Sequence, residues 1–109
     1  MFKLCRRHYH QFMVWYYTPE IGALLSKLEV LIDELLKAHT HYLMKRNTSS
    51  IEDIKDYMTV FYRQSADYYQ LIQTINKYPL SLNHMQRYAS LIARAGQHPY
   101  IRRNHDENL

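Results

Sequence analysis

The sequence is poor in the residues that turn or end a chain: of its 109 residues, two are glycine and three are proline. Their scarcity predicts few tight turns and favours long helices. Two glycines are also too few for a glycine-rich loop that cradles a phosphate. An apolar fraction of 47% is too high for a disordered chain and fits one globular domain.

Other features that the sequence lacks bear on the cellular compartment of the protein. A single cysteine, Cys5, leaves no internal disulfide and suits a reducing compartment, so we expect a cytoplasmic protein. Stretches without a charge are shorter than the roughly eighteen apolar residues of a membrane span. The basic N-terminus is followed by the sequence HYHQ (8–11) rather than by an apolar core, which is unlike a secretory signal. A mitochondrial-type presequence stays open for residues 1–17.

What is present is a sequence of helical periods separated by start and stop signals. Thr18-Pro19-Glu20 is typical of a helix start, because threonine can cap, proline suits the first position and an acid favours the helix dipole. We therefore expect one helix before residue 18 and a second from about Pro19 to Arg46. The second has a wide apolar stripe that suits two packing neighbours, with members Ile21, Leu24, Leu25, Leu28, Leu31, Ile32 and Leu35.

Two further helices follow the polar run 47–50. Ser49 or Ser50 is expected to cap the third, which should end near Tyr78 because Pro79 disfavours helix in the residue before it. Its core face is expected to follow a period of alternating steps of three and four, with members Ile51, Ile54, Met58, Phe61, Ser65, Tyr68, Ile72 and Ile75. Ser81 is expected to cap the fourth, and Gly96 should end it. Its expected core stripe is Leu82, Met85, Ala89 and Ile92, with Tyr88 and Leu91 alongside.

These elements predict an all-α fold, a small antiparallel bundle of about four helices. The two long central helices form a hairpin, and the shorter first and fourth helices pack across it. Residues 1–96 are expected to form the domain, and residues 97–109 a loose polar tail. The sequence shows no internal repeat.

The N-terminal segment sorts into two stripes when it is wound into a helix. One is apolar, with Phe2, Cys5, Tyr9, Phe12 and Tyr16; the other is basic, with Lys3, Arg7 and His10 beside Arg6. We expect the apolar stripe to dock on the bundle. The basic stripe is then an exposed surface, and Trp15 lies off the main apolar stripe.

Motifs for catalysis or metal binding are missing. His8 and His10, like His39 and His41, are two residues apart, whereas ligand pairs on one helix need a spacing of three or four. The sequence has no HExxH or ExxH motif and no cysteine pair. We therefore expect no catalytic residue, cofactor, metal or small-molecule substrate. A small helical enzyme with dispersed catalytic residues is the remaining enzymatic alternative.

Tyrosine and the distribution of charge point to binding. The chain has eleven tyrosines, of which Tyr62 and Tyr69 are one heptad apart and share a helix face. The net charge is +4, and positive residues gather at the two ends of the chain. In an up-and-down bundle the first and fourth helices are neighbours, so we expect these residues to merge into one basic patch. Apolar residues off the main seams of the central helices, such as Val30, Leu36, Leu43 and Val60, exceed what a small bundle hides, which predicts a homodimer or a protein partner.

The sequence thus predicts a small non-enzymatic helical protein that binds another macromolecule, as an adaptor, chaperone or regulator of a protein. The alternative is a nucleic-acid-binding regulator that uses its basic N- and C-terminal helices. The candidate partner-binding residues are Lys3, Arg6, Arg7, His10, Trp15, Tyr62, Tyr69, Arg87, Arg94, Arg102 and Arg103.

Overall fold

The computed structural model describes residues 2–45, 47–48 and 50–101, with side chains from residue 8 onward. Its helices are α1 (Phe2–Lys45), α2 (Ile51–Ile75) and α3 (Leu82–Ala95), and a further helical turn begins at 99–101. No strand occurs in these ranges, so the all-α prediction is confirmed.

The predicted break at Thr18-Pro19 is wrong, because α1 continues through Pro19 as one helix of 44 residues. The Thr18 hydroxyl does not cap a new helix; it donates a hydrogen bond of 2.6 Å to the carbonyl of Val14, four residues earlier. Proline removes one backbone donor from a helix interior, and its ring crowds the carbonyl four residues back. The predicted first and second helices are therefore two halves of α1.

The starts of α2 and α3 agree with the caps predicted from the sequence. Ser50 caps α2 in a capping box: its hydroxyl accepts from the Asp53 amide at 3.2 Å, and the Asp53 carboxylate accepts from the Ser50 amide at 3.3 Å. Ser81 caps α3, with its hydroxyl accepting from the His84 amide at 3.1 Å. These short local signals set both starts independently of the packing.

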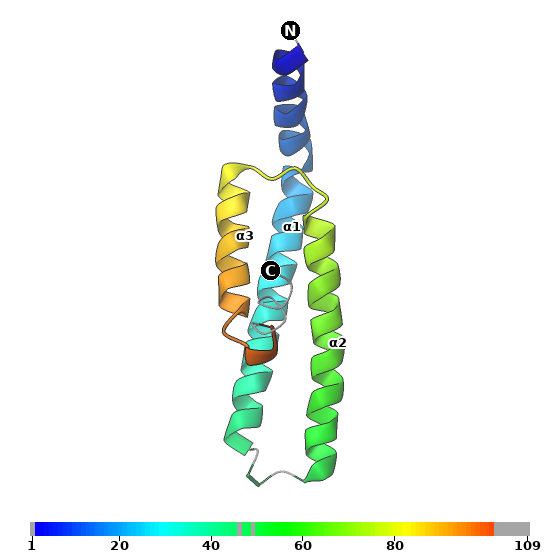
Figure 1. The fold of residues 1–109 in the computed structure, drawn as a ribbon, viewed down its shortest axis with the longest axis vertical. Helices are drawn as coiled ribbons and strands as arrows, with labels where there is room; N and C mark the ends of the chain where they lie inside the picture. Colours follow the sequence, from blue (N-terminus) through cyan, green and yellow to red (C-terminus); the bar gives the residue numbers. More distant parts are fainter. Residues whose placement is uncertain (1, 46, 49, 102–109) are drawn as a thin grey trace.

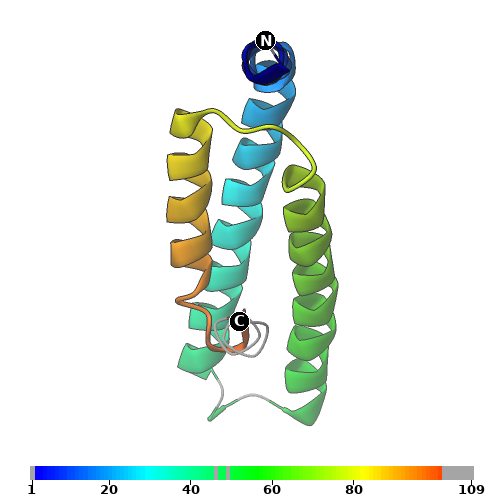
Figure 2. The same cartoon turned by 45° about the horizontal axis from the view of Figure 1, so that its top comes forward.

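The long helix α1 is the axis of the molecule, and α2 and α3 both pack against it. Figure 1 shows α2 running antiparallel to α1, the 76–81 connection crossing over α1, and α3 returning along the other side of α1. The chain measures 66 × 27 × 18 Å, and a helix of 44 residues at 1.5 Å per residue accounts for the whole length. Figure 2 shows that the N-terminal end of α1 extends beyond both neighbours.

The core lies where the three helices meet. On α1 it uses the predicted stripe, with Ile21, Leu25, Leu28, Ile32 and Leu35 fully or almost fully buried. The core of α2 includes three residues that the period predicts, Phe61, Tyr68 and Ile75. The same period fails at the start of that helix, where Ile51 is 73% exposed.

The predicted core stripe of α3 is only partly right: Ile92 packs against the core, as do Tyr88 and Leu91 beside the stripe, but Ala89 is exposed. Leu82 and Met85 are exposed, whereas Leu91 and Ala95 are buried and Tyr88 packs against the core. The spacing 88–91–95 is as helical as the predicted one, so periodicity alone does not choose between them. Which face of α3 is buried depends on how this helix packs against α1.

The predicted loose tail is wrong for residues 97–101. His98 is fully buried and Ile101 is 1% exposed, and Ile101 joins the core of the bundle. After α3 the chain turns back onto the bundle instead of leaving it (Figure 1). The rest of the predicted tail, residues 102–109, lies outside the described residues.

Candidate functional site

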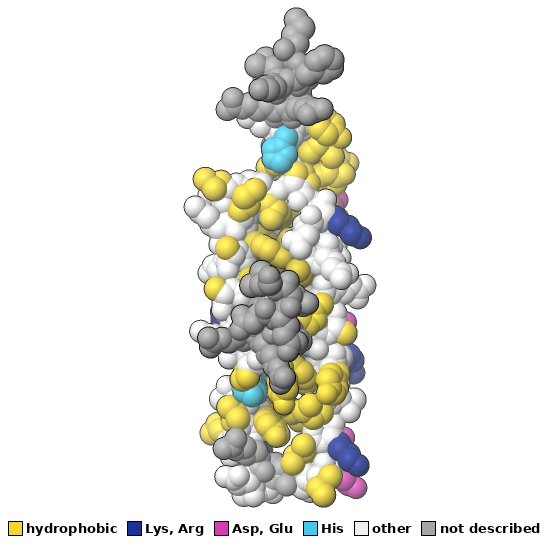
Figure 3. Space-filling view, viewed as in Figure 1, with side chains coloured by type: hydrophobic (Ala, Val, Ile, Leu, Met, Phe, Trp, Pro, Cys, Tyr) yellow, Lys and Arg dark blue, Asp and Glu magenta, His cyan; other side chains and the backbone are white. Residues whose placement is uncertain are grey.

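The first candidate site is the projecting end of α1, which we call the N-terminal arm (residues 2–17). Its aromatic side chains are exposed: Tyr9 65%, Phe12 54%, Trp15 72% and Tyr16 58%. The Phe12 ring centroid lies 6.1 Å from those of both Trp15 and Tyr16, so these rings form one apolar cluster. Figure 3 shows hydrophobic side chains gathered on this projecting end.

The arm is exposed because the neighbouring helices stop short of it. Tyr17 marks the boundary, where its ring packs edge-on against Tyr78 with centroids 5.2 Å apart. On another side of the arm, His10, Gln11 and Val14 face the start of α3 across a small hollow, while the aromatic cluster has no cover among the described residues. The prediction that Tyr9, Phe12 and Tyr16 dock on the bundle is therefore wrong.

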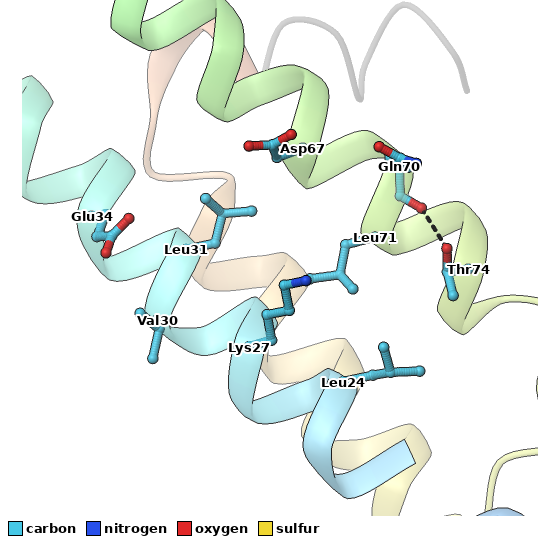
Figure 4. A pocket seen from close by; sticks show the side chains of 9 residues that line it. All are labelled: Leu24, Lys27, Val30, Leu31, Glu34, Asp67, Gln70, Leu71 and Thr74. Atoms are coloured by element: carbon cyan, nitrogen blue, oxygen red, sulfur yellow. Dashed lines mark hydrogen bonds between the residues drawn. The ribbon is translucent and has the colours of Figure 1, made fainter. Parts of the chain in front are cut away.

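The second candidate site is a groove between α1 and α2, which the sequence analysis missed. Five of its side chains come from α1 and four from α2, and its volume is about 650 Å³. Figure 4 shows Leu31 and Leu71 between the two helices, with Lys27 reaching across toward α2. The full lining is Leu24, Lys27, Val30, Leu31, Glu34, Asp67, Gln70, Leu71 and Thr74.

The groove combines four aliphatic side chains with polar ones, among them Lys27 and Gln70, and it is acidic at one end. Glu34 and Asp67 stand toward the end farther from the arm, and Leu24 and Thr74 toward the nearer end (Figure 4). The Thr74 hydroxyl is already used, since it donates to the Gln70 carbonyl at 3.0 Å. Val30, which the sequence analysis expected outside the main seams, is 57% exposed at the edge of the groove. An apolar floor with a charged rim suits an amphipathic helix.

The predicted basic patch is only partly described, and its described arginines form ion pairs. Arg87 lies 3.3 Å from the carboxylate of Glu29 and donates to the Ser26 hydroxyl at 3.2 Å. Arg94 pairs with Asp33 in the same way, one helical turn further along α1. Both residues therefore tie α3 to α1.

The remaining predicted residues lie in different settings. His10 is exposed on the arm. Tyr62 is 63% exposed, whereas Tyr69 is partly buried and packs against the core, so their shared heptad position does not give them one environment. The side chains of Lys3, Arg6 and Arg7, and the whole of Arg102 and Arg103, lie outside the described residues.

A buried cluster around His98 is the third feature of interest. The His98 ring stacks on Phe61 at 4.8 Å between centroids and lies 4.6 Å from the ring of His39. His39 Nδ1 lies 3.2 Å from the Tyr57 hydroxyl, but neither ring nitrogen of His98 has a hydrogen-bond partner among the described residues. Burial, with a smaller contribution from His39, lowers the pKa of His98 to about 4. Burial also lowers the pKa of His39.

This cluster has the character of a packed core and not of a metal centre or acid–base pair. Within the described ranges, no three His, Cys, Asp or Glu side chains come together as a cation would need. With a pKa of about 4, His98 is neutral and packed against rings at pH 7. A signal was present in the sequence: Ile101 follows His98 at helical spacing, which places an apolar residue in the supposed tail.

Comparison of the chain with protein-family models, with curated proteins and with solved structures finds no match. Within the part of the chain that the structure describes, no helix is long and apolar enough to cross a membrane. The candidate binding surfaces are the two on α1, the exposed arm and the groove beside α2.

Proposed function

We propose that this chain is a non-enzymatic helical protein that acts by binding another protein, as an adaptor, chaperone or regulator in the cytoplasm. The observation that carries the proposal is the exposed aromatic cluster of Tyr9, Phe12, Trp15 and Tyr16, held out on a helix beyond the bundle. Tyrosine and tryptophan are enriched at the energetic centres of protein interfaces. An uncovered apolar patch of this kind typically marks an interaction site.

The ion pairs of the described arginines favour protein binding over nucleic-acid binding. A nucleic-acid surface needs cations that are free to meet phosphates. Arg87 and Arg94 are instead paired with Glu29 and Asp33. The nucleic-acid alternative then depends on Lys3, Arg6 and Arg7 near the start of the chain and on Arg102 and Arg103 near its end.

A photo-crosslinking experiment in the source cell tests the proposal. A photoreactive phenylalanine analogue replaces Trp15, and in a matched control it replaces Met44, which is 81% exposed on the same helix. We expect protein adducts at position 15 that are absent at position 44. Equal labelling at both positions, or none at 15, would contradict a protein-binding arm.

A salt titration separates the two classes of partner. Reversing Lys3, Arg6 and Arg7 to glutamate should weaken binding to random DNA and RNA, with a steep salt dependence, only if the arm contacts phosphates. For a protein partner, Trp15→Ala should weaken binding at least as much as the triple reversal. Tight, salt-sensitive binding to random nucleic acid would favour the alternative.

A further inference from the structure

We propose that the protein bound by the arm is a second copy of this chain: in an antiparallel dimer, the arm of each chain lies in the α1–α2 groove of the other. This inference rests on the proposed function and names its partner. It starts from the fact that the molecule carries both an uncovered apolar helix end and an unfilled apolar groove.

The two surfaces lie on the same side of α1. Phe12 and Val30 are eighteen residues apart, as are Met13 and Leu31, and Tyr16 and Glu34. Eighteen residues are five turns of 3.6 residues, so each pair shares one angular position on the helix. A second α1 laid along this side can therefore meet the arm and the groove at once, without any bend in either chain.

Charge selects the antiparallel direction. The basic residues of the arm are near its N-terminal end in sequence, at Lys3, Arg6 and Arg7, and the arm has no acid. The groove has its acids, Glu34 and Asp67, at the end farther from its own arm. Only an antiparallel helix brings a basic N-terminal end to that acidic end. The aromatic part of the arm then lies over Leu24, Lys27 and Leu31, where a lysine ammonium is also favoured against an aromatic face.

Symmetry makes the contact reciprocal. A two-fold axis that pairs Phe12 with Val30 crosses α1 midway between them, at residue 21, and the exposed Ala23 lies two residues from it, on the same helix face as Phe12 and Val30. Such an isologous contact closes on itself and leaves no surface for further growth. It also buries the arm and the groove of each chain. Burying both brings the area buried on each partner toward the about 800 Å² of a standard interface.

Sedimentation of the full chain and of three variants tests the dimer. Phe12→Asp alters the arm and Val30→Asp alters the groove at sites that are already more than half exposed, so both should fold. Because each change occurs twice in a symmetric dimer, we expect either one to raise the dissociation constant at least about a hundredfold. The matched control Met44→Asp, an exposed apolar site outside both surfaces, should leave it unchanged.

Mixing the two variants distinguishes an arm–groove contact from any other dimer. Neither variant has an intact contact with itself. A mixed pair has one, in which the arm of the Val30→Asp chain meets the groove of the Phe12→Asp chain. We therefore expect the mixed pair to associate more tightly than either variant alone, and a mixture that shows no such preference overturns the proposal.

A cross-link locates the two-fold axis. In a Cys5→Ser background, Ala23→Cys should form a dimer that a short bismaleimide cross-links, because a residue close to the axis lies near its own copy. Ser90→Cys, exposed on α3, should stay monomeric under the same conditions. Equal cross-linking at both positions contradicts the proposed geometry.

The possible results distinguish the arm–groove dimer from protein binding by the arm in general. A wild-type chain that stays monomeric at high concentration, or a Val30→Asp chain that still dimerises, overturns the dimer. If position 15 nevertheless cross-links to a different protein, protein binding by the arm stands and only the identity of the partner is wrong. If neither a second copy nor another protein is captured, both proposals fall.

Discussion

The two halves of α1 have the same kind of apolar pattern and opposite fates. Residues 21–35 place apolar side chains at alternating steps of three and four and bury them completely. Residues 9–16 follow the same rule with aromatic side chains and leave them more than half exposed. The difference is the presence of α2 and α3 beside one half only. A helical period therefore shows which side chains share a face, while burial depends on what the rest of the chain places against that face.

The largest expected effect comes from the buried half. Leu28→Ala removes a fully buried side chain and leaves a cavity between α1 and its neighbours, so it should lower the free energy of unfolding by about 2–5 kcal/mol. Urea denaturation followed by circular dichroism measures this. A loss below about 1 kcal/mol would mean that the core does not lie on this face of α1.

The next effect depends on pH, because buried His98 is neutral in the folded chain. Its pKa is about 4 when folded and about 6.5 when unfolded, so between these values the unfolded chain binds more protons. The free energy of unfolding should therefore fall as the pH falls from about 6.5 to 4, by on the order of 3 kcal/mol from this residue alone. The lowered pKa of His39 acts in the same direction.

His98→Phe provides the control for that pH dependence. The phenyl ring keeps the stacking on Phe61 and cannot be protonated, so the variant should lose less stability than the wild type between pH 7 and 4.5. The difference between the two unfolding curves isolates His98 from the carboxylates, which titrate in both proteins. Parallel curves would show that His98 is solvated in the folded chain.

A smaller effect is expected where α3 is tied to α1. Arg94→Ala breaks an ion pair whose two side chains are 44% and 47% exposed, so it should cost less than about 1 kcal/mol, and less still at high salt. Thermal unfolding at low and high salt checks both statements. A loss above about 2 kcal/mol would mean that the pair is shielded from water.

The smallest effect on stability is expected in the arm. The sequence predicts that the Phe12 ring docks on the bundle, which would make Phe12→Ala costly, but the ring is 54% exposed. The change should now alter the free energy of unfolding by about 0.5 kcal/mol or less in dilute solution, where the chain has no partner. Urea denaturation beside Leu28→Ala gives the direct contrast. A loss comparable to that of Leu28→Ala would show that the arm folds back onto the bundle.

Local signals made part of this fold predictable. Ser50 and Ser81 act as caps through their own hydroxyls, and the stripe from Ile21 to Leu35 is wide enough to identify a buried face. Thr18-Pro19 misled because proline is usually excluded from a helix interior, whereas α1 continues through Pro19. The burial of His98 and the register of α3 depend on contacts between distant segments, which a local pattern does not contain.

The candidate site was predictable in kind rather than in position. An excess of aromatic and apolar side chains, including Trp15 and Val30, predicted surfaces beyond the needs of the core. The groove itself was out of reach, because it combines Leu24 and Leu31 with Leu71 from another helix. The predicted merging of basic ends did not anticipate that Arg87 and Arg94 meet acids of α1.

The central claim is that the arm is open in the single chain and is covered by the groove of a second one. Trp15 is the only tryptophan, and its ring centroid lies 6.1 Å from that of Phe12, so its emission and its quenching by acrylamide change when a second chain covers Phe12. Measured from submicromolar to millimolar protein, the wild type should pass from an exposed to a protected Trp15. Val30→Asp, which leaves the arm intact, should stay exposed throughout. An unchanged wild-type signal over that range, or the same protection in Val30→Asp, would contradict the account.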